Sequence, residues 1–415
     1  MTLGIKKARW FQTLLLFLAV LGPGIVTGSV DNDAGGITTY SVAGAQYGYH
    51  LLWTLFPAFI VLLVVQEMNA RMGIVTGKGL ADLIRENAGV KLTLLIFSGM
   101  LVVDIGNTMT EFAGVAGSLD IFGVSKYVSV PLTAVAVWFL VVKGTYKIAE
   151  RIFLIFSAFL LTYVVSAILA KPDWGAVGTA IVHPDIQADS AYISMVIGLI
   201  GTTVAPWMQF YMQSSVIEKG LKLEDWKLTL ADVAVGCLLT VVVAFFIMVA
   251  CASTLHAHGI QIEKASDAAR ALAPLAGEAA SFVFAGGLFV ASVFAATILP
   301  VTTSFYICEA FGFEAGIDKT LRQAPQFYGL FTSILVIGVA IVLIPGIPLI
   351  RISLISQVIN GLLLPIILVC MMLLVNDKEI MGKYVNGRFS NTVGWVTVGT
   401  LAILSLFLVG TTIFG

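Results

Sequence analysis

The chain has 415 residues, of which 59% are hydrophobic and only 11% are charged, and its mean hydropathy is +0.99. Soluble domains carry about 25% charged residues, so this composition excludes an ordinary soluble protein and predicts a polytopic protein of the lipid bilayer. The net charge of −1 is uninformative, because the distribution of the charges is what matters in such a protein, and no nucleic-acid partner is predicted. All four cysteines lie in apolar stretches, which is typical of buried thiols rather than of disulfides.

Apolar runs between charged or glycine- and proline-rich breaks predict an all-α integral membrane protein with eleven transmembrane helices, since a span needs about 20 apolar residues. Basic residues precede the first run, but no small-residue cleavage site follows it, so we interpret it as a span and not as a signal peptide. Short connections predict one transmembrane domain over residues 1–415. The predicted spans lie at 11–46, 51–72, 92–119, 128–143, 152–170, 191–217, 229–252, 278–308, 326–345, 350–375 and 393–413.

Lysine and arginine fall unevenly on the two sides of these spans, and these residues favour the cytoplasmic side of a membrane. If the N-terminus is cytoplasmic, 18 of the 23 basic residues lie inside and 5 lie outside. The asymmetry predicts a multi-pass protein of the cell membrane, with its N-terminus in the cytoplasm and its C-terminus outside.

The first and sixth predicted spans are interrupted near their middles, at DNDAGG (31–36) and at GTTVAP (201–206). Glycine and proline disfavour a continuous helix, and matching breaks in two halves of a membrane protein indicate a transporter's binding site. The alternatives are a glycine packing point in the first span and a simple proline kink in the sixth. The pair of breaks favours two inverted five-helix repeats, at 1–170 and 191–375, followed by an added eleventh helix at 393–413.

Acidic side chains in two of the spans predict a cation site. An aspartate inside a membrane costs about 2.5–3.5 kcal/mol on insertion scales, so Asp33 in the first break is a functional candidate. Glu111 and Asp104 lie seven residues apart in the third span, near one helix face. Carboxylates with backbone carbonyls and water form the ligand set of Mg²⁺, Ca²⁺ or Mn²⁺. The alternative for Glu111 and Asp104 is a carboxyl group packed against a neighbouring polar side chain.

Other polar side chains in the spans admit two interpretations. Gln357 and Asn360 lie one turn apart in the tenth span, where they either line the same cavity or form an interhelical hydrogen bond. Gln66 and Glu67 lie near Arg71 at the end of the second span, which favours a structural ion pair. The chain has no HExxH motif, no GxSxG motif and no nucleotide-binding loop, so an enzyme is not predicted.

Four motifs, in the same order, resemble those of the Nramp family of divalent metal transporters. GPGIVTGSVDNDAGG resembles the family's first-span segment with its Asp-Pro-Gly-Asn core, and GTTVAPWMQFYMQSS resembles the sixth-span segment with its Met-Pro-His core. TEFAGVAGSL is similar to the third-span Ala-Glu-Val-Ile-Gly stretch, and SQVINGLLLP to the tenth-span Ser-Gln-Val segment. The resemblance covers nearly the whole chain, and it implies the LeuT-type fold and alternating access.

The resemblance also implies a metal site with altered ligands. Asp33 falls on the metal-binding aspartate, Glu111 on the third-span glutamate and Gln357 on the tenth-span glutamine. Gly36 stands where the family has its asparagine ligand, and Ala205 stands where it has its methionine ligand. Thr202 falls on the residue that offers a backbone carbonyl to the metal. We therefore predict the metal site at Asp33, Glu111, Thr202, Gly36, Ala205 and Gln357.

Residues that carry protons in the family are replaced as well. Trp207 falls on the histidine associated with proton coupling, and Thr108 falls where many members carry an aspartate. The ninth span, 326–345, contains no arginine, unlike that of proton-coupled members. Without a soft thioether, and with more space, the site suits a partly hydrated Mg²⁺, which gives up its water reluctantly. These changes resemble the Nramp-related magnesium transporter branch.

The predicted function is therefore import of Mg²⁺, and of Mn²⁺, by alternating access without proton coupling. One alternative is a proton-coupled Mn²⁺ or Fe²⁺ transporter. A sodium-coupled amino-acid carrier is a second, although Asp33 would repel a substrate carboxylate, and a receptor that transports nothing is a third. The prediction includes no cofactor apart from the transported ion and no obligate protein partner, so we expect a monomer.

Overall fold

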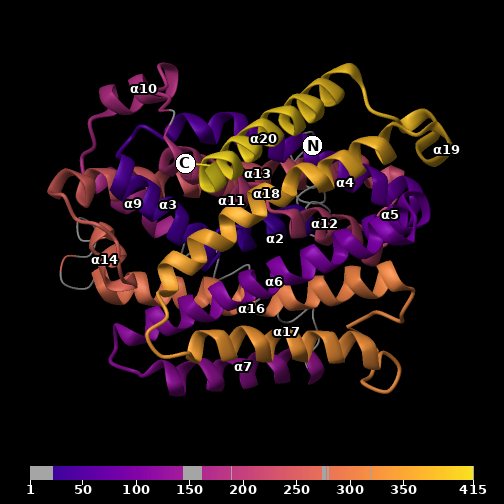
Figure 1. The fold of residues 1–415 in the computed structure, drawn as a ribbon, viewed down its shortest axis with the longest axis horizontal. Helices are drawn as coiled ribbons and strands as arrows, with labels where there is room; N and C mark the ends of the chain where they lie inside the picture. Colours follow the sequence, from indigo (N-terminus) through magenta and orange to yellow (C-terminus); the bar gives the residue numbers. More distant parts are fainter. Residues whose placement is uncertain are drawn as a thin grey trace, which may run out of the picture.

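The structure is a computed structural model that describes residues 22–143, 161–187, 189–272, 277, 280–317 and 319–414. In these residues the protein is helical throughout and contains no strand (Figure 1). The α-helices are α2 (Pro23–Val30), α3 (Ala34–Tyr47), α4 (Leu55–Thr76), α5 (Leu80–Ala88), α6 (Val90–Asp120), α7 (Lys126–Lys143), α9 (Leu161–Leu169), α10 (Trp174–Val182), α11 (Ser190–Thr203), α12 (Pro206–Glu218), α13 (Trp226–Thr254), α14 (Ala265–Ala269), α16 (Ala280–Phe311), α17 (Pro325–Leu343), α18 (Leu349–Asn376), α19 (Lys378–Met381) and α20 (Arg388–Phe414).

Nine stretches of the described residues are long and apolar enough to cross a membrane. They match the second, third, fourth and sixth to eleventh predicted spans, and the broken sixth span is among them as Ser190–Glu218. The first predicted span corresponds to α2 and α3, each too short to cross alone, and its residues 11–21 lie outside the described residues. The fifth corresponds to α9, and its residues 152–160 also lie outside them. The number eleven therefore stays a prediction.

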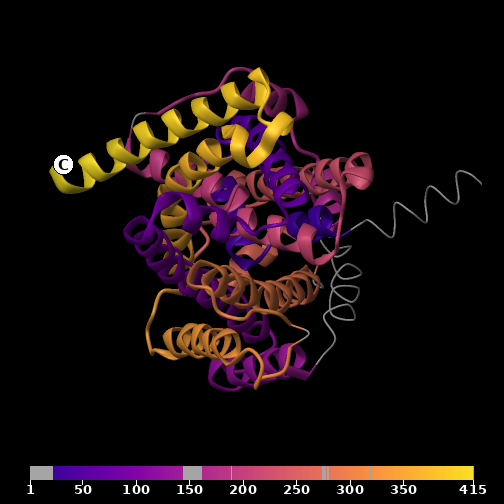
Figure 2. The ribbon, with the colours of Figure 1, turned by 90° about the vertical axis from the view of Figure 1, so that its right-hand side faces the viewer.

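Long helices with apolar outer faces form the exterior of the bundle. Helices α7 and α17 run beside α6 and α16 at one edge (Figure 1), and α20 lies on the outside of the opposite part (Figure 2). Large apolar side chains of α20 point outward, including Ile403 and Leu406, which are 69% and 73% exposed. Apolar side chains are stable against lipid. The helical backbone is stable there too, because it satisfies its own hydrogen bonds.

Each broken helix packs against a helix from the other half of the chain. Helices α2 and α3 lie against α13, and α12 lies against α4. The third helix of each half, α6 and α16, pack against each other. Such an exchange of partners is what two repeats in an inverted arrangement produce, and it agrees with the predicted division at 1–170 and 191–375, which stays a prediction.

Helix α2 is held to α13 by its own backbone. The carboxylate of Asp232 on α13 accepts hydrogen bonds from the backbone N–H groups of Gly22 (3.2 Å), Gly24 (2.6 Å) and Ile25 (3.4 Å). Where the two helices cross, a Cβ atom at Gly236 would lie 2.0 Å from the carbonyl oxygen of Gly24. Asp232 thus supplies the acceptor that the free N–H groups at the start of a helix require.

At the end of the second span, the predicted ion pair with Arg71 is formed by Glu67 but not by Gln66. Arg71 donates to both carboxylate oxygens of Glu67, at 2.9 Å and 3.1 Å. Gln66 takes no part in this pair and is almost completely buried. Adjacent helical residues point about 100° apart, so Gln66 faces a different neighbour.

Candidate metal site at the two helix breaks

The first break is shorter than predicted, because its glycines are helical. Helix α2 ends at Val30 and α3 begins at Ala34, so only residues 31–33 interrupt the span. Asp33 is the N-cap of α3, and its carboxylate accepts a hydrogen bond of 2.7 Å from the backbone N–H of Gly36. A capped N-terminus presents N–H groups and a positive dipole end, which places the Asp33 carboxylate at the start of α3.

Glu111 reaches the same turn of α3 from the third span. Its carboxylate accepts a hydrogen bond of 3.2 Å from the backbone N–H of Ala34. In an unbroken helix that N–H would donate to the carbonyl of Val30. Asp33 and Glu111 thus accept hydrogen bonds from backbone N–H groups of the same turn, at Gly36 and Ala34. Both side chains are buried, at 7% and 1% exposure, so the structure brings together the two acids predicted for the site.

The second break lies at residues 204–205, between the end of α11 at Thr203 and the start of α12 at Pro206. The helical partner of the Thr202 carbonyl would be the N–H of Pro206, which proline lacks. This carbonyl is therefore free of its helical bond, as a carbonyl ligand requires. The hydroxyls of Tyr40 on α3 and Thr203 on α11 share a hydrogen bond of 2.8 Å, and this bond joins the two broken helices.

Gln357 of α18 lies between the two broken helices. A Cβ atom at Gly35 would lie 2.3 Å from the side-chain nitrogen of Gln357, and one at Gly201 would lie 2.3 Å from its backbone oxygen. Gln357 is therefore in close contact with both α3 and α11. Of its two interpretations, the one in which it lines the site agrees with this position.

Gly36 and Ala205, two of the predicted site positions, bring no side-chain ligand to the site. A Cβ atom at Gly36 would lie 2.5 Å from the carbonyl oxygen of Asp31, so this backbone admits only glycine there. Ala205 is buried at the N-cap of α12, and its carbonyl accepts a hydrogen bond of 3.1 Å from the side chain of Gln209. Neither position contributes a sulfur or amide ligand.

Asp104, the other acid of the third span, points away from the site. Its carboxylate accepts hydrogen bonds from Thr303 (2.9 Å) and Tyr306 of α16, and from Asn107 on its own helix (3.0 Å). The side chain is completely buried. This is the alternative considered for it, a carboxyl group packed against neighbouring polar groups.

Amide side chains connect Asp104 to the site. Asn107 and Asn360 form two hydrogen bonds with each other, at 2.8 Å and 3.2 Å. Asn360 also donates to the side-chain oxygen of Gln357 at 3.0 Å. The interhelical bond considered for the tenth span is therefore present at Asn360, while Gln357 faces Gly35. Asn107 is not among the predicted site residues, since a single amide in a span carries no pattern of its own.

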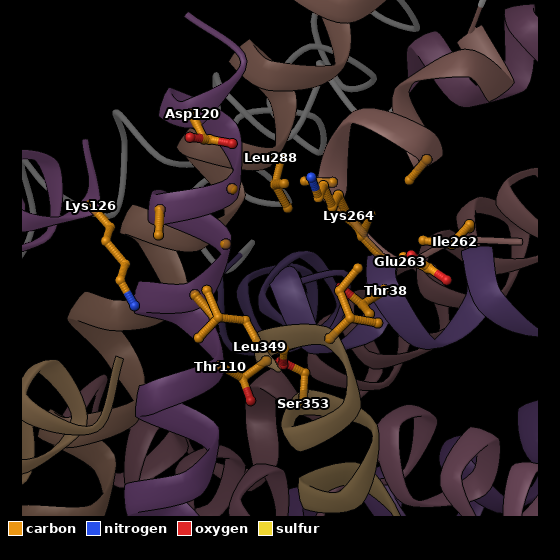
Figure 3. Close-up of a pocket in the computed structure, with 18 of the residues that line it drawn as sticks. Thr38, Thr110, Asp120, Lys126, Ile262, Glu263, Lys264, Leu288, Leu349 and Ser353 are labelled. Carbon is orange, nitrogen blue, oxygen red and sulfur yellow. The ribbon is translucent and has the colours of Figure 1, made fainter. Parts of the chain in front are cut away.

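A cavity of about 670 Å³ leads from the surface toward the site. Its inner residues include Thr38 of α3 and Thr110 of α6, which come one turn after Ala34 and next to Glu111, and Ser353 of α18. Figure 3 shows these three side chains facing the hollow. Charged groups of both signs line its outer part, namely Asp120, Lys126, Glu263 and Lys264. We call this cavity the vestibule.

Trp207 and Thr108, which the resemblance assigns to the proton-coupling positions, have side chains without a titratable group. Trp207 is buried in the apolar core with its ring edge-on to Tyr211. The hydroxyl of Thr108 donates to the backbone oxygen of Asp104 at 2.8 Å. Helix α17 contains no acidic, basic or histidine residue.

Side-chain ligands for a metal are few. Within the described ranges, no group of three or more His, Cys, Asp or Glu residues is arranged to hold a metal ion. A cation between Asp33 and Glu111 would therefore complete its coordination with carbonyl oxygens, amide oxygens and water. Those are the ligands of a hard cation.

Comparisons with solved structures define the class of fold. The crystal structure of the Eremococcus coleocola manganese transporter in complex with an aromatic bis-isothiourea substituted compound matches with a TM-score of 0.75 and 22% sequence identity, over 95% of this chain and 87% of that chain. A point mutant of that transporter matches with a TM-score of 0.76 and 21% identity over the same shares. Mhp1, a nucleobase-cation-symport-1 family transporter, matches with a TM-score of 0.59 and 13% identity, over 94% of this chain and 93% of that chain. The protein is therefore a multi-pass membrane protein with the LeuT-type transporter fold, as predicted.

The sequence identifies the family within that class. The family model of Nramp, described as natural resistance-associated macrophage protein-like, matches residues 24–411. The chain belongs to the Nramp family of divalent metal transporters, and it is a transporter rather than an enzyme.

Proposed function

We propose that the protein imports Mg²⁺, and also Mn²⁺, by alternating access and without coupling to protons. The ion would bind between Asp33 and Glu111, with the Thr202 carbonyl and Gln357 beside it. The resemblance to a manganese transporter supports a divalent cation as substrate, and the departures from the family pattern support Mg²⁺ as one of the ions carried.

The observation that carries this proposal is the pair of buried carboxyl groups at the start of α3. Two carboxylates this close repel each other in a medium of low dielectric constant, and a divalent cation between them would remove the repulsion. Gly36 and Ala205 add no side-chain ligand, so water would fill the remaining positions. Mg²⁺ usually keeps several waters in proteins. Such a site therefore suits Mg²⁺ better than it suits an ion that favours sulfur ligands.

The two sides of the site differ in access, and this supports alternating access. The vestibule reaches Thr38, one turn after Ala34, and Thr110, which precedes Glu111 in the sequence. On the opposite side, α2, α4, α12 and α13 enclose only a cavity of about 10 Å³, roughly enough for one water molecule. With the orientation proposed from the basic residues, the vestibule faces outward and the closed side faces the cytoplasm.

Transport without proton movement is supported by Trp207, Thr108 and the uncharged helix α17. The alternative of a proton-coupled Mn²⁺ or Fe²⁺ transporter would need another acid for the proton, and the buried Asp104 is the candidate for it. Its carboxylate is connected through Asn107 and Asn360 to Gln357. A sodium-coupled amino-acid carrier is disfavoured, because Asp33 would repel the substrate carboxylate.

Uptake into proteoliposomes tests the proposal. Purified protein would be reconstituted with a Mg²⁺-sensitive dye inside, and uptake would be measured under an inside-negative potential, with empty liposomes as the control. Time-dependent Mg²⁺ uptake that saturates is the expected result. Mn²⁺ or Fe²⁺ uptake without Mg²⁺ uptake would favour the proton-coupled transporter. Amino-acid uptake driven by sodium, or no uptake of any solute, would favour the carrier or the receptor.

A further inference from the structure

Buried polar atoms without a hydrogen-bonding protein partner concentrate on the closed side of the site. Among the described residues, more than half of such side-chain atoms belong to α4, to α12 or to the chain around the first break. They are the Ser29 hydroxyl, both carboxylate oxygens of Asp31, the amide oxygens of Asn32, Asn69 and Gln213, and both amide atoms of Gln66. All but one of these atoms are oxygens.

Gln66 faces the small closed cavity. Thr27 and Gly28 of α2, which lie about one turn before Asp31, line the cavity together with Cys237 and Thr240 of α13. Gln66 of α4 also lines it, and the residue is only 2% exposed. Gln66 and the part of α2 that precedes the first break thus line the same cavity.

Further amide side chains lie along α12 and α4, from the second break toward Lys78. The carbonyl of Ala205 accepts from Gln209, whose side-chain oxygen accepts a hydrogen bond of 2.6 Å from Asn69 of α4. One turn further along α12, Gln213 donates to the backbone oxygen of Lys78 at 2.7 Å. Gln213 comes eight residues after Ala205, so the polar groups from the Ala205 carbonyl to the Gln213 amide cover about 12 Å. We name Gln66, Asn69, Gln209 and Gln213 the amide stripe.

An arrangement made only for stability would not leave these atoms unpaired. A buried polar group without a partner costs about 1–3 kcal/mol, and an apolar side chain of the same shape avoids that cost. Native proteins contain few such groups, so a concentration of them in one region indicates a function. The unpaired atoms are nearly all acceptors, and the water molecules around a hydrated cation present O–H donors outward.

We propose that the amide stripe, with Asp31, lines the route by which the ion leaves the site toward the Lys78 end of the molecule. Its side-chain oxygens would accept hydrogen bonds from the waters of the hydrated ion, so the ion need not lose them on the way. This inference rests on the proposed function of the Asp33 and Glu111 site, and it adds a second station that contacts the ion through water.

The test replaces Gln66, because neither of its polar atoms has a protein partner to lose. Gln66→Leu should lower the maximal rate of Mg²⁺ uptake about tenfold or more, with little change in KM. Binding of Mg²⁺ to the detergent-solubilised variant, measured by calorimetry, should stay within about twofold of wild type, because Asp33 and Glu111 are unchanged. The melting temperature should stay equal or rise, since an unpaired amide is removed. Gln66→Glu, which keeps the acceptor oxygen and replaces the amide nitrogen with a second one, should retain uptake.

Ser129→Ala on α7 is the matched control, because it removes another buried, unpaired polar atom far from the stripe. Its uptake should equal that of the wild type. If Gln66→Leu transports at the wild-type rate, or if it loses melting temperature and uptake together, the inference is wrong. Should that variant fail to fold, Gln66→Met would decide by the same criteria. The wild-type arm tests the proposed function separately: if it carries Mn²⁺ but not Mg²⁺, the magnesium assignment fails, and the stripe is then tested on Mn²⁺ uptake.

Discussion

Asp33, the N-cap of α3, and Glu111 of α6 engage backbone N–H groups two residues apart in the first turn of α3. Asp33 accepts from Gly36 at 2.7 Å, and Glu111 accepts from Ala34 at 3.2 Å. The positive end of the α3 dipole stabilises both negative charges. A divalent cation bound to the two carboxylates would compete with these donors, so we expect a site that binds its ion weakly enough to release it.

Asp33→Ala should abolish Mg²⁺ uptake while the fold persists. The substitution removes one of only two carboxylates at the break, and we expect uptake at least about tenfold lower, which corresponds to 1.4 kcal/mol or more. Metal-dependent dye fluorescence in proteoliposomes measures the effect, with expression level and monodispersity as controls. If the variant takes up Mg²⁺ as the wild type does, the assignment of the ion site to the first break is wrong.

Glu111→Gln should lower Mg²⁺ uptake more than Asp104→Asn does. Glu111 contacts the turn that carries Asp33, whereas Asp104 is bound to Thr303 and Tyr306 on α16. Both substitutions preserve volume and remove one charge, so each serves as the control for the other. Uptake normalised to the amount of folded protein is the quantity to compare. Greater damage in the Asp104 variant would show that the wrong acid of the third span has been assigned to the ion.

Uptake of Mg²⁺ or Mn²⁺ should not move protons. Trp207 and Thr108 do not titrate, and α17 carries no charged residue. A pH-sensitive dye inside the proteoliposomes should stay constant during uptake, while a proton-coupled family member acidifies its vesicles in parallel. Acidification that follows metal uptake and persists when the membrane potential is clamped would contradict this prediction. Asp33, Glu111 or Asp104 would then carry the proton, and the proton-coupled transporter would become the better interpretation.

Gly201→Ala should destabilise the protein, whereas Gly198→Ala should not. A Cβ atom at Gly201 would lie 2.3 Å from the carbonyl oxygen of Gln357 and 2.4 Å from the backbone nitrogen of Gly361, so α11 and α18 would have to separate. Overpacking of this kind typically costs 1–3 kcal/mol. At Gly198, three residues earlier on the same helix, the nearest atom would lie 3.4 Å away, which is ordinary contact. Thermal unfolding of both variants in detergent checks the difference, and equal melting temperatures would show that the backbone contact is not rigid.

The sequence predicts the site's charged groups better than it predicts their connections. Asp33 and Glu111 stand out because an acid in an apolar span is costly, and the structure brings them together. The amide connection from Asp104 to Gln357 joins residues 253 positions apart at Asn107 and Asn360, and no local pattern indicates such a pairing. The fold class follows from apolar runs, but the exact extent of the breaks depends on capping. Asp33 caps α3, so the glycines that suggested a longer break are helical.

Gln66 shows a second limit of sequence reasoning. Its neighbour Glu67 pairs with Arg71 as predicted, and proximity along the chain suggested the same role for both. Their side chains point in different directions on α4, and only the three-dimensional packing shows that Gln66 lines a small closed cavity together with residues of α2, α12 and α13. Three-dimensional neighbours, not local spacing, therefore separate a structural residue from a candidate for the ion route.

The contact of Asp232 with α2 has a consequence for the speed of the transporter. If the small cavity is to open during transport, α2 must leave α13, and the three backbone hydrogen bonds to Asp232 must break. Because the donors are main-chain groups, no substitution in α2 other than proline removes one of them. The side chain at position 232 of α13 therefore determines the strength of these hydrogen bonds. Two such transporters with identical ion ligands, and so with the same affinity, would turn over at different rates if they differed only at this one position.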